Sequence, residues 1–152
     1  MNPQSLETTV EKFILRVKKG LRYSKDDVWV EKEDGHYSLG LTDYTQRRGG
    51  DIVFLEFQGK GSTIEAGGSV ACYETIKAAL EVKAPFDCGI VEFNQILTEQ
   101  PELINEDPYG KGWVARVKPV NPDSFEALSS PEEYFELMKE KAHAATSTIR
   151  GK

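Results

Sequence analysis

Apolar and polar residues alternate along several short segments of this chain, and glycine or proline residues lie between many of them. Alternation with a period of two is typical of β-strands that bury one face. The Asp34-Gly35 pair favours a tight hairpin turn between the first two predicted strands. Together these signals predict strands at residues 28–31, 36–41, 51–57, 68–73, 80–83, 89–93 and 113–119.

A helical pattern is found near both ends of the chain. Close to the N-terminus, apolar residues recur every three or four positions, which predicts a helix over residues 1–20 that Ser5 caps and Gly20 ends. Its predicted apolar face contains Leu6, Val10, Phe13, Ile14 and Val17. Near the other end, Ser130-Pro131-Glu132-Glu133 is a capping box with proline at the first helical position. It predicts a helix over residues 130–145, followed by a frayed tail over residues 146–152.

The order of these elements indicates the fold class. A third, short helix is expected over residues 42–48, where Gly49-Gly50 ends it. Many short strands between turns, with a helix near each end, predict a mainly β protein. We expect one domain over residues 1–152, built as a β-sandwich or flattened barrel with flanking N- and C-terminal helices.

Charge and composition exclude several classes of function. The 152 residues carry a formal net charge of −6 with a pI near 5.0 and no basic stripe, so no nucleic-acid partner is expected. No apolar run reaches membrane-spanning length and the N-terminus does not resemble a signal peptide, so we expect no membrane partner and a cytoplasmic location. The sequence has no phosphate-binding loop, metal-ligand spacing or nucleophile elbow, and it therefore predicts no catalytic or metal-binding residue.

One lysine lies at the centre of a predicted hairpin. Residues 68–73 lead into the turn and residues 80–83 lead out of it, which places Lys77 at an exposed tip. A lysine held out from a rigid sheet suits covalent attachment, because acylation removes its charge and adds the chemistry of the acyl group. The alternative is an ordinary solvated lysine in a turn.

The residues around Lys77 belong to an ordered set of short motifs. The set consists of Gly40-Leu41-Thr42-Asp43-Tyr44 with Gln46, Gly50-Asp51-Ile52-Val53-Phe54, Gly61, Glu74-Thr75-Ile76-Lys77-Ala78-Ala79, Ala84-Pro85, Val91-Glu92-Phe93-Asn94, Pro101-Glu102-Leu103-Ile104-Asn105, Asp107-Pro108-Tyr109-Gly110 and Gly112-Trp113. In this order the motifs resemble the lipoyl carriers typified by the H protein of the glycine cleavage system. Each motif is weak alone, whereas the ordered set is specific.

The resemblance implies a hammerhead β-sandwich with lipoic acid in amide linkage to Lys77. It implies a carrier that is not itself a catalyst. The implied partners are a lipoate ligase or lipoyl transferase, dihydrolipoamide dehydrogenase and the glycine cleavage enzymes. An exposed tip gives the access that thiol–disulfide exchange requires, and a rigid sheet lets a ligase recognise one lysine. Glu74 is a candidate for that recognition, with a solvated acid as the alternative.

Two departures from the family pattern concern the cleft that holds the lipoyl arm. The family usually has His-Glu before the first tryptophan, and this glutamate complements the cationic amine of an aminomethyl cargo. Here Asp27-Val28 precede Trp29, and Leu80 replaces the usual serine after the lysine. Because Val28 has no charge, the sequence predicts weaker storage of an aminomethyl group.

The two cysteines, Cys72 and Cys88, are too few for a disulfide framework. One interpretation is small apolar packing or turn filling. The other is a thiol that exchanges with the lipoyl sulfurs or with a carried sulfur species. The second interpretation requires that a strand place a cysteine near the cleft of the arm.

The departures resemble a second branch of the family, the H-like lipoate-binding proteins that serve a heterodisulfide-reductase-like complex in sulfur oxidation. The sequence therefore leads to the hypothesis of a divergent carrier of sulfur species. One alternative is a glycine cleavage H protein that shuttles the aminomethyl group, and another is an unmodified structural module of the same fold. A biotin carrier is disfavoured because no methionine flanks Lys77.

Overall fold

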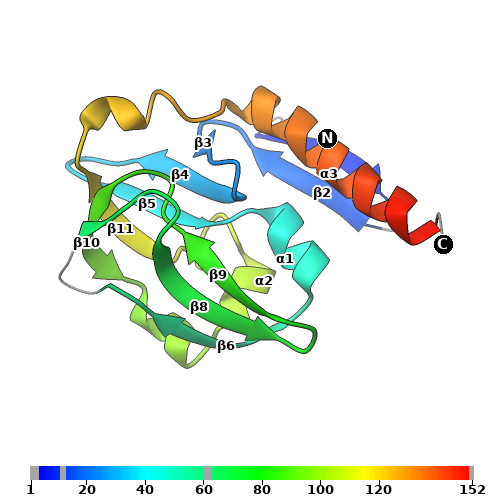
Figure 1. The fold of residues 1–152 in the computed structure, drawn as a ribbon, viewed down its shortest axis with the longest axis horizontal. Helices are drawn as coiled ribbons and strands as arrows, with labels where there is room; N and C mark the ends of the chain where they lie inside the picture. The colour runs from blue at the N-terminus through cyan, green and yellow to red at the C-terminus, as the bar shows by residue number, and fades with distance from the viewer. Residues whose placement is uncertain (1–3, 11–12, 60–62, 151–152) are drawn as a thin grey trace.

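The computed structural model describes residues 4–10, 13–59 and 63–150, so the Gly61 motif lies outside the described residues (Figure 1). Its strands form a six-stranded sheet of order β3-β4-β5-β11-β10-β7, a three-stranded sheet of order β6-β8-β9, and a separate β1-β2 hairpin. The strand bounds are β1 Ser5–Val10, β2 Phe13–Lys18, β3 Arg22–Tyr23, β4 Val28–Lys32, β5 Tyr37–Leu41, β6 Ile52–Phe57, β7 Thr63–Ile64, β8 Ser69–Thr75, β9 Ala79–Lys83, β10 Cys88–Phe93 and β11 Ala115–Pro119. The helices are α1 Asp43–Gly49, α2 Leu103–Glu106 and α3 Pro131–Arg150, with 3-10 turns η1 Gln95–Thr98 and η2 Pro122–Ser124.

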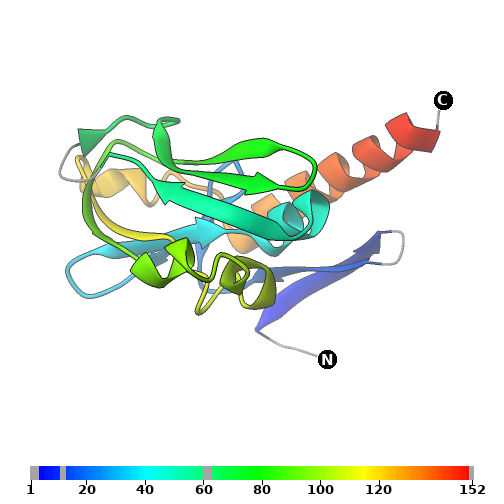
Figure 2. The same cartoon turned by 90° about the horizontal axis from the view of Figure 1, so that it is seen from below.

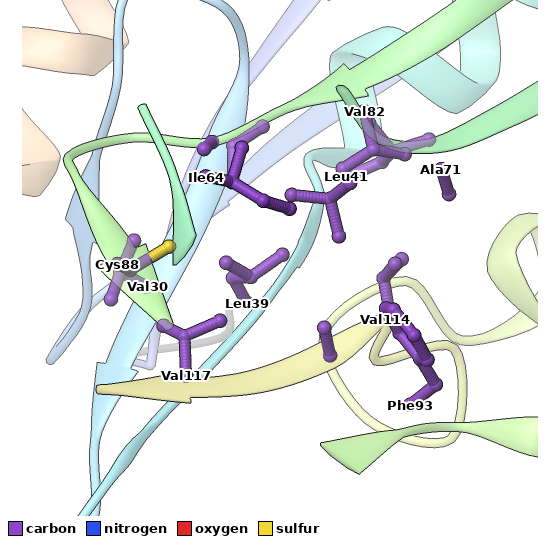
Figure 3. Close-up of a cluster of buried hydrophobic side chains, with 14 of the residues drawn as sticks. Val30, Leu39, Leu41, Ile64, Ala71, Val82, Cys88, Phe93, Val114 and Val117 are labelled. Carbon is purple, nitrogen blue, oxygen red and sulfur yellow. The ribbon is translucent and has the colours of Figure 1, made fainter. Parts of the chain in front are cut away.

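The two larger sheets enclose the main core. Leu39 and Leu41 from β5 lie in one buried cluster with Val70 from β8 and Val82 from β9. Figure 3 shows part of this cluster, and Figure 2 shows the β6-β8-β9 sheet as a separate layer over β4. This arrangement confirms the predicted mainly β sandwich. Strands such as β9, which buries Val82 between the exposed Glu81 and Lys83, turn one face to the core.

Strand β4 is buried on both faces and joins the main core to a second one. Val28 and Val30 belong to the main core, whereas the intervening Trp29 belongs to a cluster built with α3, α1 and the β1-β2 hairpin. Successive side chains of a strand point to opposite faces, so Trp29 packs on the side away from the β6-β8-β9 sheet. Within this second core, the rings of Tyr23 and Tyr134 stack with centroids 4.7 Å apart.

The predicted N-terminal helix over residues 1–20 is wrong. The described part of this segment forms the antiparallel β1-β2 hairpin, in which Ser5 pairs with Lys18. The hairpin buries alternate residues of β2, Leu15 and Val17, against the second core and leaves Ile14 45% exposed. The segment forms paired strands because it is rich in β-branched residues and because both strands pack against α3 (Figure 1).

The other predicted helices are confirmed. Thr42 caps α1. At α3, Glu133 N donates to Ser130 Oγ (3.1 Å) and Ser130 N donates to Glu133 Oε1 (2.8 Å), which is the predicted capping box. These bonds lower the pKa of Glu133. Helix α3 continues to Arg150, beyond the predicted end near residue 145, and residues 151–152 of the predicted frayed tail lie outside the described residues.

Among the described helices, none combines the length and the apolar character needed to cross a membrane.

Candidate functional site

Lys77 lies in the three-residue turn between β8 and β9, as predicted, with its side chain exposed. Thr75 fixes the turn: its Oγ1 accepts hydrogen bonds from Lys77 N and Ala78 N, both at 3.2 Å. Thr75 N also donates to Ala78 O at 2.9 Å. Ile76 is 89% exposed. The turn backbone is therefore held in place while the lysine side chain points to solvent.

The base of the hairpin is braced on two sides. Ile52 of β6 pairs with Thr75, and Phe54 pairs with Glu74. A Cβ at Gly49 would lie 3.7 Å from Thr75 Cγ2, so the end of α1 packs closely against this base. Figure 1 shows the green β8-β9 hairpin with its turn at the edge of the molecule, below α1 and beside β6. A rigid support under an exposed lysine is the arrangement that selective acylation needs.

Glu74 is exposed on β8, between Phe54 of β6 and Ala79 of β9 in the two ladders. The exposed Val53 and Phe54 lie beside it on the edge strand β6. A macromolecule that reaches Lys77 from this side would meet a carboxylate next to apolar side chains. Glu74 therefore remains a candidate for recognition by a ligase.

A cleft of about 360 Å³ lies beside the hairpin. Its lining residues are Lys25, Asp26, Asp27, Leu41, Thr45, Arg48, Tyr73, Ala79, Leu80, Glu81, Lys83 and Lys141. The cleft follows β9 away from the Lys77 turn, and four steps of a strand from Ala79 to Lys83 span about 13 Å. An acyl chain on Lys77 can therefore fold back along β9 into this space.

The cleft contains one buried carboxylate, that of Asp27. Tyr134 Oη donates to Asp27 Oδ1 at 2.7 Å, and Lys141 Nζ lies 3.1 Å from Oδ1 and 3.2 Å from Oδ2. Burial, with the Asp27 charge, raises the pKa of Tyr134 well above its usual value, so this phenol stays a hydrogen-bond donor. Burial raises the pKa of Tyr73 to about 12, which keeps a second neutral phenol on the cleft wall.

The cleft contains a buried carboxylate although Val28 has no charge. Val28 is fully buried in the main core and does not line the cleft, whereas the preceding Asp27 does. Asp27 has φ +65°, a left-handed conformation that short polar residues tolerate. The sequence showed an acid at this position but could not show this backbone conformation. Leu80 lines the cleft, and Lys141 from α3 is a cleft residue that sequence reasoning missed.

Neither cysteine is among the residues that line the cleft. Cys88 is a fully buried residue of β10 in the main core rather than part of a turn, and burial raises its pKa to about 11 (Figure 3). Cys72 is half-buried on β8, where it pairs with Glu56 and Glu81 in the neighbouring strands. The placement of these thiols gives no support to sulfur exchange with the arm.

Within the described part of the chain, no group of three His, Cys, Asp or Glu side chains could hold a metal ion.

Several motifs of the resemblance hold the scaffold together. Asn105 Oδ1 accepts from Ile52 N (2.9 Å), and its Nδ2 donates to Gly50 O (3.0 Å). Asn94 Nδ2 donates to Trp113 O at 2.8 Å. The 107–110 turn does not line the cleft; instead Pro108 O accepts from Trp29 Nε1 at 2.8 Å.

Comparison with known proteins agrees with this geometry. The family model described as "Glycine cleavage H-protein" matches residues 21–141. The chain belongs to the glycine cleavage H-protein family. A probable glycine cleavage system H protein of Aeropyrum pernix is 40% identical over 141 residues, which cover 93% of this chain and 99% of the relative. The glycine cleavage system H protein of Carboxydothermus hydrogenoformans is 42% identical over 125 residues, 82% of this chain and 96% of the relative.

A solved structure supports the fold. The crystal structure of a glycine cleavage system H protein from Mycobacterium marinum aligns with a TM-score of 0.70 and 30% identity, over 78% of this chain and 95% of that chain. Glycine cleavage H proteins carry a covalently attached lipoate on a lysine and act as carriers, not catalysts. Family membership therefore confirms the predicted fold class, cofactor and non-catalytic role. It favours the glycine cleavage alternative over the sulfur-carrier hypothesis.

Proposed function

We propose that Lys77 carries the lipoate and that this H protein shuttles the aminomethyl group between the glycine cleavage enzymes. The observation that carries the proposal is an exposed lysine on a braced turn, two residues before Ala79 in the lining of a cleft that contains a buried carboxylate. Lipoate supplies a dithiolane whose sulfurs accept and release cargo.

The cleft fits such an arm in shape and in chemistry. Ala79 and Leu80 offer an apolar wall next to Lys77, which suits the hydrocarbon part of an acyl chain. Most of the other lining residues are polar or charged, and they include Asp27. A carboxylate in a partly desolvated position attracts a cationic amine more strongly than one in water does. This distribution supports a cationic cargo at the end of the arm.

The sulfur-carrier hypothesis loses its main support. It depended on the missing carboxylate at position 28 and on Leu80, and Asp27 supplies the carboxylate from the adjacent position. Lipoate ligase or lipoyl transferase, and dihydrolipoamide dehydrogenase, are the further partners that we propose, because an arm must be attached and its dithiol reoxidised.

The test is a reconstituted glycine–bicarbonate exchange assay with glycine cleavage enzymes. The lipoylated protein is expected to support exchange at a rate comparable to that of an ordinary H protein, and Lys77→Arg is expected to give none. A lipoylated wild-type protein that supports no exchange, while an ordinary H protein does so with the same enzymes, would contradict the pathway and reopen the sulfur hypothesis.

A further inference from the structure

We propose that Asp27 and the backbone carbonyl of Lys25 form a binding site for a primary ammonium group, and that Lys141 fills this site as an internal, displaceable occupant. The site lies in the cleft beside the Lys77 hairpin. The link to the cargo rests on the proposed function above, whereas the site itself does not.

The contacts of Lys141 define the site. Its Nζ atom lies 2.7 Å from Lys25 O, 3.1 Å from Asp27 Oδ1 and 3.2 Å from Asp27 Oδ2. A primary ammonium group has three N–H donors and no acceptor, so three converging oxygens satisfy it fully. Within this arrangement the carboxylate supplies the countercharge. The bound Lys141 side chain therefore indicates that the site accepts a primary ammonium group.

The carboxylate of the site is held by contacts that do not depend on Lys141. Asp27 is 8% exposed, and its Oδ1 accepts from Tyr134 Oη at 2.7 Å. The backbone of Asp27 is bonded on both sides, since Asp27 N donates to Ser24 O (3.2 Å) and Thr42 N donates to Asp27 O (3.1 Å). Removing Lys141 is therefore expected to leave a formed, negatively charged site.

The occupant is less constrained than the site. The side chain of Lys141 is 31% exposed, compared with 11% for that of Asp27. A lysine ammonium on a flexible four-carbon stem can move into solvent, where it is strongly hydrated. Lys141 is thus the partner that can leave, and its departure would free the carboxylate for another ammonium.

The remaining charges of the cleft favour a single cation at this site. Lys25, Arg48 and Lys83 also line the cleft, together with the acids Asp26 and Glu81. With Lys141 in place the positive side chains outnumber the negative ones, and like-charge repulsion disfavours a second ammonium nearby. The cationic end of a loaded arm and Lys141 are therefore expected to compete for Asp27. This competition makes Lys141 a residue that limits how long the cleft retains a cationic cargo.

The test uses the unmodified protein, so it is independent of lipoylation. Methylammonium chloride is titrated into wild type, Lys141→Met and Lys139→Met while the amide NMR shifts of residues 25–28 are followed. Lys139 is the matched control, because it lies on the same helix but pairs with Glu136 at 3.0 Å. Lys141→Met is expected to bind methylammonium saturably and at least about tenfold more tightly than the other two proteins, a difference of about 1.4 kcal/mol.

Two further titrations establish the chemistry of the site. In the Lys141→Met background, Asp27→Asn is expected to abolish binding, and asparagine tolerates the left-handed backbone of this position. Tetramethylammonium, a cation without N–H donors, is expected not to bind. A folded Lys141→Met protein that binds no methylammonium, or that binds both cations equally, would overturn the proposal. Lys141→Gln provides a second background in which the same outcomes apply.

The result is separable from that of the proposed function. If Lys77 is not lipoylated but Lys141→Met binds methylammonium, the carrier proposal fails and the ammonium site stands. If Lys77 is lipoylated and supports exchange but Lys141→Met binds no methylammonium, the site fails alone.

Discussion

Gly40 lies directly opposite Trp29 in the antiparallel ladder of β4 and β5, and a Cβ on Gly40 would be 2.8 Å from three atoms of the indole ring. The indole covers the glycine backbone, and its Nε1 donates to Pro108 O. Two motifs of the family resemblance, at residues 40–44 and 107–110, therefore meet at one tryptophan. The contact between Gly40 and Trp29 fixes the position of β4, the strand that separates the two cores of the protein.

Gly40→Ala is expected to destabilise the protein by about 1–3 kcal/mol, because the added methyl group forces the buried indole to move. Gly89→Ala is the control, since a Cβ at Gly89 would meet no atom within 4 Å. Chemical denaturation measures both variants. Equal stability of the two variants would show that the Trp29 contact does not constrain position 40.

Tyr134→Phe is expected to cost about 1–3 kcal/mol of folding stability, because it removes a buried donor from Asp27 and the 2.9 Å hydrogen bond with Thr42. Tyr44→Phe offers a matched control: Tyr44 Oη is buried and has no hydrogen-bond partner among the described residues. Its removal is expected to be neutral or stabilising. A similar loss in both variants, measured by urea unfolding, would contradict the assigned role of Tyr134.

Stability above pH 9 is expected to depend on Cys88. The pKa of this buried thiol is raised from 9.0 to about 11, so the folded state retains a proton that the unfolded state loses. The contribution of the neutral thiol is complete below pH 9 and is lost as pH rises to about 11, an effect of about 3 kcal/mol. Cys88→Ala is expected to flatten this decline in pH-dependent denaturation, whereas Cys72→Ala is not. Identical slopes for wild type and Cys88→Ala would contradict the prediction.

Glu74→Gln is expected to lower the initial rate of lipoylation by a lipoate ligase about tenfold, the effect of losing one charged contact. Glu56→Gln is the control, because Glu56 is an exposed acid on the neighbouring strand β6. The rate is read from intact mass over time. If both variants are modified as fast as the wild type, Glu74 is a solvated acid, which was the alternative from the sequence.

Much of the fold could be predicted from the sequence where local chemistry and packing agree. The β4-β5 hairpin is specified by the Asp34-Gly35 turn and by strands that place alternate residues in the main core, Val28 and Val30 on β4 and Leu39 and Leu41 on β5. In the N-terminal segment the local signals disagree, because its apolar spacing fits a helix while its β-branched residues favour strands. Only packing beside α3 decides between the two, and a single sequence does not show that contact.

The candidate site was predictable only where it depends on local features of the chain. The position of Lys77 follows from its own hairpin, a local feature of the chain. The cleft brings together Asp27, Arg48, Leu80 and Lys141 from distant segments. Their meeting depends on the left-handed backbone at Asp27 and on the length of α3, and neither can be inferred from residue spacing.

Attachment of lipoate to Lys77 can be measured by intact mass after co-expression of the protein with a lipoate ligase in the presence of lipoate. Wild type and Lys83→Arg are expected to gain the mass of one lipoyl group, and Lys77→Arg is expected to gain none. Lys83 lies on the same hairpin and is exposed, so it is the appropriate control. An unmodified wild type, in cells where a known carrier is lipoylated, or a lipoylated Lys77→Arg protein, would contradict the account.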